Sequence, residues 1–140
     1  FKSNHYIETQ GVLKILLSRF IEEGTVSKLE AINRGDLNKV IVYIGKHLNK
    51  DLSVKKLADH CGFSEDHFSR RFLDSFGIRP NRYIQQKRVR QAQLLLVTTN
   101  YSLKQIAKHV GLENISYFSR TFKKIVGNTP ANFRKQHSKI

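Results

Sequence analysis

The chain has 140 residues, a formal net charge of +14 and a pI near 10.2. Such a charge points to a polyanionic partner, although a ribosome-associated protein or one bound to acidic lipid would also be basic. The single cysteine excludes an internal disulfide framework and fits a reducing compartment, here the cytoplasm. The sequence shows no apolar run of about 18 residues and no secretory signal, so no membrane contact is expected.

The positive charge is concentrated after residue 50. Residues 1–50 carry a net charge of +3, whereas residues 51–140 carry +11. After Asp74 the only acidic residue is Glu113. The polyanion is therefore expected to bind the later part of the chain.

The first 24 residues contain one strongly apolar helical stripe. A helix this apolar usually packs on two sides, so we expect it to belong to a domain or dimer contact outside this chain. An ordinary core helix of the same domain is the alternative. The chain begins with Phe1 and has no methionine, which indicates the C-terminal part of a longer protein. The stripe consists of Leu13, Leu16, Leu17, Phe20 and Ile21.

Residues 25–35 are predicted to be a polar linker with at most a short helical turn over residues 26–32. Asp36 is expected to cap the next helix, because its side chain can accept a hydrogen bond from the first turn. That helix is predicted to end at Asn49 and Lys50. Its apolar stripe is Leu37, Val40, Ile41, Ile44 and Leu48.

Residues 53–77 are predicted to form a short helix, a turn and a second helix. Ser53 and Ser64 are the expected N-caps, and Gly62 supplies the positive φ that the turn needs. Gly77 ends the second helix. The expected buried side chains are Val54, Leu57, Ala58, Phe68, Phe72 and Phe76.

The longest helix is predicted from Pro80, which suits the first turn of a helix, to about Val97. Its apolar positions are Tyr83, Ile84, Val89, Ala92, Leu95 and Leu96, and its exposed side is expected to carry Arg82, Lys87, Arg88 and Arg90.

Residues 102–137 are predicted to form a second pair of helices and a short tail helix over 131–137. Ser102 and Asn114 are the expected N-caps, Gly111 lies in the turn, and Gly127 ends the long helix. The expected inward side chains are Leu103, Ile106, Ala107, Phe118, Phe122, Ile125, Val126 and Phe133.

The second pair of helices repeats the first. Residues 53–62 align with 102–111 at an offset of 49, and residues 67–72 align with 117–122 at an offset of 50. Two helices joined by a short glycine-containing turn are typical of a helix-turn-helix unit, whose second helix can lie in the major groove of DNA. The sequence therefore predicts an all-α DNA-binding domain over residues 34–140. Its first helix-turn-helix unit covers about 36–78, its connecting helix about 80–98 and its second unit about 102–137.

The outward residues of the two second helices are the candidate base contacts. Arg70 and Arg120 hold equivalent places in the repeat, and an arginine can donate two hydrogen bonds to O6 and N7 of guanine. Asp66 can accept from a cytosine amino group or repel wrong sequences, and Ile115 can contact a thymine methyl group. A solvated helix face is the alternative for each. The predicted set is Glu65, Asp66, Ser69, Arg70, Ile115, Ser116, Ser119 and Arg120.

Contacts to DNA phosphates are predicted at two helix N-termini and three lysines. The connecting helix, about 18 residues at roughly 1.5 Å each, spans roughly 27 Å against about 34 Å for one turn of DNA. It is therefore expected to place two recognition helices in successive major-groove segments, so that a monomer reads a site without two-fold symmetry. A mismatch would require DNA bending or leave one helix on the backbone. The predicted phosphate contacts are Ser53, Lys87, Ser102, Lys123 and Lys124.

Residues 36–137 closely resemble the DNA-binding domain of the AraC/XylS family of bacterial transcription regulators. The most specific agreement runs over residues 106–112, 117–127 and 130–134, where the family has Tyr-Phe-Ser-Arg-x-Phe-Lys and then Gly-x-x-Pro-x-x-Tyr/Phe-Arg. Leu112 replaces the usual Phe, and Phe133 the usual Tyr. The resemblance implies two helix-turn-helix subdomains. It also implies base contacts at all of the predicted base-contacting residues except Glu65.

The same resemblance implies partners. Many members carry an N-terminal sensing and dimerisation domain, of which residues 1–33 would be the last helix plus the linker. Most activate transcription by contacting RNA polymerase. Double-stranded DNA, RNA polymerase and a second copy of the protein are thus the expected partners, without a cofactor.

A DNA-repair enzyme and a nonspecific DNA-binding protein are the two alternatives to this prediction. Some DNA-repair alkyltransferases carry a similar domain, but Cys61 matches Val110 in the repeat and is expected to be a small core residue. The six histidines show no metal-binding spacing, so no metal or catalytic site is predicted. A nonspecific architectural DNA-binding protein is the second alternative, recognisable by salt-dependent binding without sequence preference.

Overall fold

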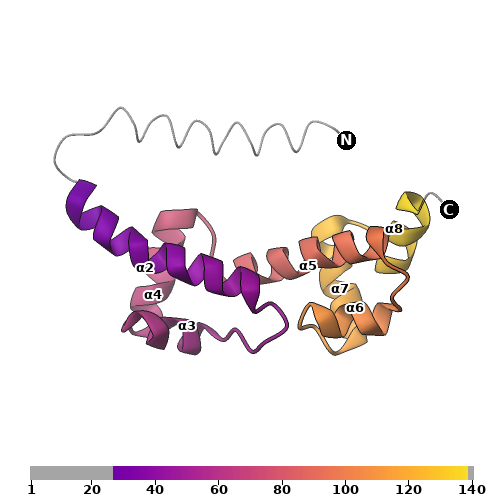
Figure 1. Cartoon of the computed structure of the whole chain (residues 1–140), viewed down its shortest axis with the longest axis horizontal. Helices are drawn as coiled ribbons and strands as arrows, with labels where there is room; N and C mark the ends of the chain where they lie inside the picture. Colours follow the sequence, from indigo (N-terminus) through magenta and orange to yellow (C-terminus); the bar gives the residue numbers. More distant parts are fainter. Residues whose placement is uncertain (1–26, 139–140) are drawn as a thin grey trace. The chain divides into compact units, whose positions relative to one another are not determined.

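The computed structural model describes residues 27–138, with side chains from residue 37 onward, and this part contains helices and no strands. The all-α prediction is confirmed for these residues (Figure 1). None of the described helices is both long and apolar enough to cross a membrane. The predicted stripe at residues 13–21 lies outside the described part of the chain. The helices are α2 (Ser27–Lys46), α3 (Val54–Cys61), α4 (Glu65–Phe76), α5 (Pro80–Thr98), α6 (Leu103–His109), α7 (Ile115–Val126) and α8 (Pro130–His137).

The chain divides into two compact parts, residues 1–35 and residues 36–140. All the side-chain contacts described below lie within residues 36–140. Helix α2 is continuous from Ser27 to Lys46, so it contains residues of both parts. The linker predicted for residues 25–35 is therefore wrong from Ser27 onward, and Asp36 does not begin a helix. A single glycine inside a helix costs only about 1 kcal/mol, so Gly35 does not stop α2.

The four predicted N-caps of the repeat are confirmed. Ser53 and Ser64 accept hydrogen bonds from the backbone N–H of Lys56 (3.3 Å) and His67 (3.2 Å). The side chain of Asn114 accepts from the Tyr117 N–H at 2.9 Å. In the remaining cap, Ser102 accepts from the Gln105 N–H at 3.1 Å, and the Gln105 side chain accepts from the Ser102 N–H at 2.8 Å.

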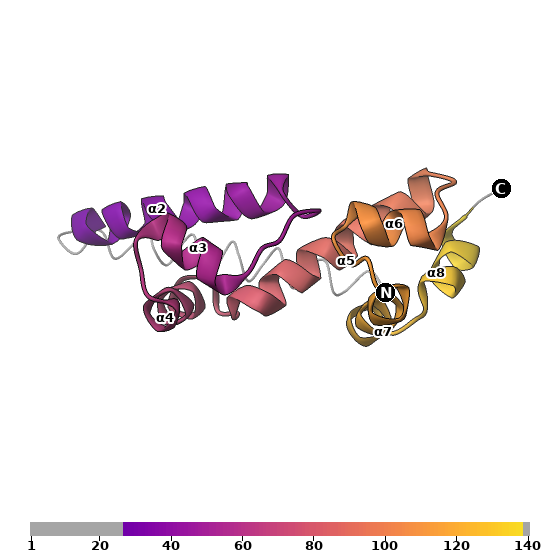
Figure 2. The ribbon, with the colours of Figure 1, turned by 90° about the horizontal axis from the view of Figure 1, so that it is seen from below.

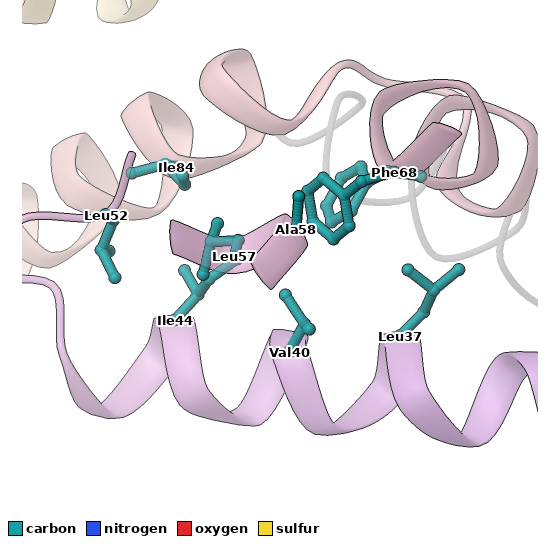
Figure 3. Close-up of a cluster of buried hydrophobic side chains, with 9 residues drawn as sticks. Leu37, Val40, Ile44, Leu52, Leu57, Ala58, Phe68 and Ile84 are labelled. Carbon is teal, nitrogen blue, oxygen red and sulfur yellow. The ribbon is translucent and has the colours of Figure 1, made fainter. Parts of the chain in front are cut away.

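The first hydrophobic core lies among α2, α3, α4 and the start of α5. Figure 3 shows Val40 and Ile44 of α2 directed toward Ala58 and Leu57 of α3. The core also contains two fully buried phenylalanines of α4 and one residue of α5. Its buried members are Leu37, Val40, Ile44, Leu52, Leu57, Ala58, Phe68, Phe72 and Ile84.

The second core lies among α5, α6 and α7, and the partly buried Phe133 of α8 packs against it. Helix α5 therefore contributes to both cores: Ile84 near its start belongs to the first, and Val89 to the second. Ile125 was predicted to face inward but is 40% exposed, because it lies on the flank of α7 that borders an open groove. The buried members are Val89, Ala92, Leu96, Ile106, Ala107, Val110, Leu112, Phe118 and Phe122.

The sequence predicted Arg88 on the exposed side of α5, but Arg88 is half-buried and joins α5 to the segment that follows α2. Its Nε donates to the carbonyl of Leu48 at 3.0 Å, and its Nη2 donates to the carbonyl of Lys50 at 2.9 Å. These carbonyls follow the end of α2, where helical partners are missing. Arg134 of α8 makes a similar pair of bonds to the carbonyls of Leu96 (3.2 Å) and Thr99 (3.5 Å) at the end of α5.

The turn of the second unit approaches this junction closely. A Cβ atom added to Gly111 would overlap the Leu48 carbonyl oxygen and lie 3.1 Å from Nη2 of Arg88. The equivalent Gly62 of the first unit has open space around it. Both glycines have a positive φ, at +80° and +69°. Gly111 is thus required for its conformation and for its lack of a side chain, whereas Gly62 is required for its conformation alone.

This difference predicts unequal effects of the same substitution. Gly62→Ala should lower the free energy of unfolding by about 1–2 kcal/mol, because alanine disfavours the left-handed region. Gly111→Ala should lower it by a further ~1–3 kcal/mol, because the added methyl group displaces backbone. Urea unfolding followed by circular dichroism measures both values. Equal losses for the two variants would show that the two units are not packed as described.

Candidate nucleic-acid interface

The outward faces of α4 and α7 are fixed by the aromatic side chains on their inward faces. Phe68 and Phe72 of α4 and Phe118 and Phe122 of α7 are completely buried. The rotation of each helix about its axis is therefore set by its core, and the opposite stripe is left in solvent. Of the eight predicted base contacts, six are exposed and Ser69 and Ser119 are half-buried.

Arg70 and Arg120 have the same surroundings in the two units. Each is exposed, and each donates from Nε to the backbone carbonyl four residues earlier, Asp66 in α4 and Ser116 in α7, at 3.4 Å. This bond holds the aliphatic part of each arginine side chain along its helix. The terminal nitrogens of the guanidinium are the atoms that would meet the edge of a guanine.

The two faces differ in charge. Glu65 and Asp66 occupy the first turn of α4, where carboxylates are stabilised by the free N–H groups at a helix start. The first turn of α7 has no acidic residue, and its last turn carries the exposed Lys123 and Lys124. The same scaffold therefore presents a partly acidic face in the first unit and a basic face in the second.

The predicted phosphate contacts fall into two groups. The hydroxyls of Ser53 and Ser102 already act as N-caps, so each has an acceptor role within its own helix. Lys123 and Lys124 are exposed. The ammonium group of the half-buried Lys87 lies 5.4 Å from the centre of the Tyr83 ring, an arrangement that stabilises a cation. Burial raises the pKa of the Tyr83 hydroxyl, which keeps that ring neutral.

An open groove of about 710 Å³ lies between the first half of α5 and one flank of α7. Arg120 and Lys124 line it from α7, and two residues that the sequence analysis did not single out as contacts, Arg79 and Arg82, line it beside the start of α5. The available signal was that the two arginines lie three residues apart at the start of the predicted helix. Their position opposite α7 follows from tertiary packing, which the repeat alone does not reveal.

Two further groups of residues, one around Tyr43 and one at Cys61, have packed surroundings. Tyr43 stacks on His47 and His60 with ring centres 4.1 and 5.2 Å apart, and no group of three metal-binding side chains occurs among the described residues. Cys61 is half-buried and packs against the first core, while its repeat partner Val110 is fully buried. Both arrangements are those of packed structural residues.

Ionisable groups near the junction show shifts with simple causes. Burial lowers the pKa of the Arg88 guanidinium, and the nearby Tyr117 and Asp51 oppose that shift. The hydrogen bond from Lys56 at 2.7 Å and its charge hold the pKa of Asp51 below its usual value. Since both side chains of the Asp51–Lys56 pair are more than 60% exposed, the pair contributes little stability.

Comparison with known proteins identifies the family. A family profile described as a helix-turn-helix domain, of the AraC/XylS type, matches residues 46–136. The chain belongs to the AraC/XylS family of transcription regulators. The resemblance found in the sequence is therefore confirmed, and with it the fold of two helix-turn-helix units.

Curated AraC/XylS-type relatives are longer than this chain. An HTH-type transcriptional regulator of Staphylococcus aureus is 31% identical over 129 residues, which is 91% of this chain and 17% of the relative. The bifunctional transcriptional activator/DNA repair enzyme AdaA of Bacillus subtilis is 43% identical over 93 residues, 66% of this chain and 44% of AdaA. The chain thus spans less than half the length of either relative.

Solved structures of AraC/XylS domains have the same fold. The DNA-binding domain of AdpA, crystallised with a target DNA, has a TM-score of 0.70 and 31% identity, covering 72% of this chain and 91% of that domain. The C-terminal domain of AraT, a response regulator from Geobacillus stearothermophilus, has a TM-score of 0.71 and 29% identity, with coverage of 74% and 86%.

The N-cap of α7 should be important for the stability of this interface. Asn114→Ala removes the acceptor for the Tyr117 N–H and should lower the free energy of unfolding by about 1 kcal/mol. Asn114→Ser keeps an acceptor at the same place and should stay within a few tenths of a kcal/mol of the parent chain. Urea unfolding of the two variants tests this. An alanine variant as stable as the serine variant would contradict the role of the cap.

Proposed function

We propose that this chain is the sequence-specific DNA-binding part of a transcription regulator. In this proposal α4 and α7 lie in two successive segments of the major groove. The observation that supports it most is the matched placement of Arg70 and Arg120. They are exposed at equivalent positions of the two second helices and held by the same backbone contact.

The charge of the chain agrees with this function. Residues 51–140 carry a net charge of +11, which favours binding to the phosphate backbone whatever the sequence. Base reading is assigned to Glu65, Asp66, Ser69 and Arg70 in α4 and to Ile115, Ser116, Ser119 and Arg120 in α7. Phosphate binding is assigned to Ser53, Lys87, Ser102, Lys123 and Lys124.

The connecting helix gives the proposal its geometry. Helix α5 has 19 residues, about 28 Å at roughly 1.5 Å per residue, against about 34 Å for a turn of DNA. Because α5 contributes side chains to both cores, one copy of the chain carries both recognition helices as one unit. A single copy would then read an asymmetric site, and the difference in length would be met by bending the DNA.

The relatives support a role in activation. AdaA is described as a transcriptional activator, and the AdpA domain was solved with a target DNA. We therefore infer that the protein activates transcription. Contact with RNA polymerase and a dimer formed through an N-terminal domain are proposed from the resemblance to the family alone. A role in DNA repair like that of AdaA is disfavoured, because Cys61 packs against the first core.

A nonspecific architectural DNA-binding protein is the second candidate. Such a protein would need the basic surface, but it would not need different outward residues on α4 and α7. The two helices do differ at equivalent positions: α4 has Asp66 where α7 has Ser116. This difference favours the reading of two different half-sites.

The proposal predicts that the two arginines determine different base pairs. Arg120→Ala should weaken binding to the preferred duplex by about 1–3 kcal/mol and relax one base position, because a bidentate contact to guanine is lost. Arg70→Ala should relax a different position, about 10 base pairs away. Selection of binding sites from a random DNA library, carried out with each variant, measures both effects.

Lys39→Ala is the control for this selection. Lys39 is exposed on α2, outside both recognition helices, and its replacement should leave the preferred sequence unchanged. The assignment of Arg70 and Arg120 to base contacts is wrong if their variants select the same sequence with the same affinity as the parent chain.

A further inference from the structure

The groove between α5 and α7 is lined by four cationic side chains. Arg79 and Arg82 lie on its α5 side, and Arg120 and Lys124 lie on its α7 side. No acidic residue is among its lining residues. Of the four, only Arg120 and Lys124 are assigned a DNA contact above. Four cations without an acidic neighbour in the lining make the groove a site of positive potential.

The groove lies beside the recognition stripe of α7. Tyr117, Arg120 and Lys124 follow one another at spacings of three and four residues, so they share one flank of the helix. Arg120 belongs to this flank and also to the outward face with Ser116 and Lys123. The basic groove is therefore continuous with the proposed base-reading surface.

A hydrogen bond fixes the position of the groove walls. The side-chain amide of Gln85 on α5 donates to the hydroxyl of Tyr117 on α7 at 2.8 Å. This bond joins residues 32 positions apart in the sequence. Figure 2 shows α7 near α5, in agreement with a contact between these two helices. The two walls are thus connected by this contact and by the second core, which contains residues of both helices.

A recognition helix in the major groove has a phosphate strand on each side. From the continuity of the two surfaces we infer that the groove between α5 and α7 binds the phosphodiester backbone that borders the major-groove segment read by α7. Arg79 and Arg82 are then phosphate contacts, and Arg120 lies between phosphate and base. This inference rests on the proposed function, because α7 must lie in the major groove for the strand to pass there.

An acidic protein segment is the other class of partner that four cations fit. DNA is favoured because Arg120 continues directly from the groove onto the outward face of α7. An acidic segment seated in the groove would compete with the DNA that this face is proposed to bind.

The test uses the double variant Arg79→Gln/Arg82→Gln. Arg79 makes no side-chain capping bond at the start of α5, and Arg82 is exposed, so the fold should be kept. At 0.15 M salt each lost phosphate contact should weaken binding about fivefold, or about twenty-fivefold for the pair, and the magnitude of the slope of log K against log salt should fall by about two. The loss should be the same on the preferred duplex and on a scrambled one.

A matched control removes the same charge elsewhere. Lys39→Gln/Lys135→Gln changes two exposed lysines that do not line the groove, and it should change affinity less than about twofold with the slope unchanged. The reciprocal variant Gln86→Lys adds a cation to the groove and should increase the slope by about one. The test therefore does not depend on the double variant alone, because Gln86→Lys should change the slope in the opposite direction.

The outcomes separate the inference from the function it rests on. A double variant with the same DNA affinity and slope as the parent chain overturns the groove assignment. If an acidic peptide then binds the parent chain but not the double variant, the groove is assigned to a protein partner. A parent chain without any preferred sequence contradicts the proposed function, yet the change in slope on any duplex still decides whether the groove binds phosphates.

Discussion

The arrangement of the two helix-turn-helix units depends on the close approach of Gly111 to the Leu48 carbonyl, which also accepts a hydrogen bond from Arg88. Two helix-turn-helix units on one chain act together only if their recognition helices keep a fixed relation. Sharing α5 between the two cores supplies part of that relation. The Arg88 bonds to Leu48 and Lys50 supply the rest, because they bind the end of α2 to the helix that enters the second unit. Arg134 makes the same kind of contact at the end of α5, so the carbonyls that follow α2 and those that end α5 are each bound by an arginine of a later helix.

A shared scaffold with different surfaces follows from this arrangement. The caps, the turn glycines and the buried phenylalanine pairs are common to both units and set the orientation of α4 and α7. The outward residues are then free to differ, and they do: α4 begins with two carboxylates, while α7 ends with two lysines. Since the core fixes the helix rotation, a change on the outward face should have little effect on folding. This separation of core and surface lets the two helix-turn-helix units share a scaffold and carry different outward residues, as the proposed reading of two half-sites requires.

Much of the fold follows from local rules in the sequence. The repeat, the caps at Ser64 and Asn114 and the aromatic stripes predict helix starts, turns and inward faces, because each depends on residues a few positions apart. The sequence did not predict the continuous α2, since residues 34–36 have the composition of a break, and it placed Arg88 in solvent. The basic groove was missed for a similar reason: Arg79 and Lys124 line one groove only because α5 packs against α7. Local patterns specify elements, whereas contacts 30 or more residues apart depend on how those elements pack.

In the proposed function, one copy of the chain reads two successive major-groove segments. Methylation interference on the preferred duplex measures this, because a methyl group on N7 of guanine blocks the contact proposed for Arg70 and Arg120. Two clusters of interfering guanines are expected, about 10 base pairs apart on one face of the DNA. A single cluster, with specific binding retained, would contradict the proposed function and leave one of the two helices outside the major groove.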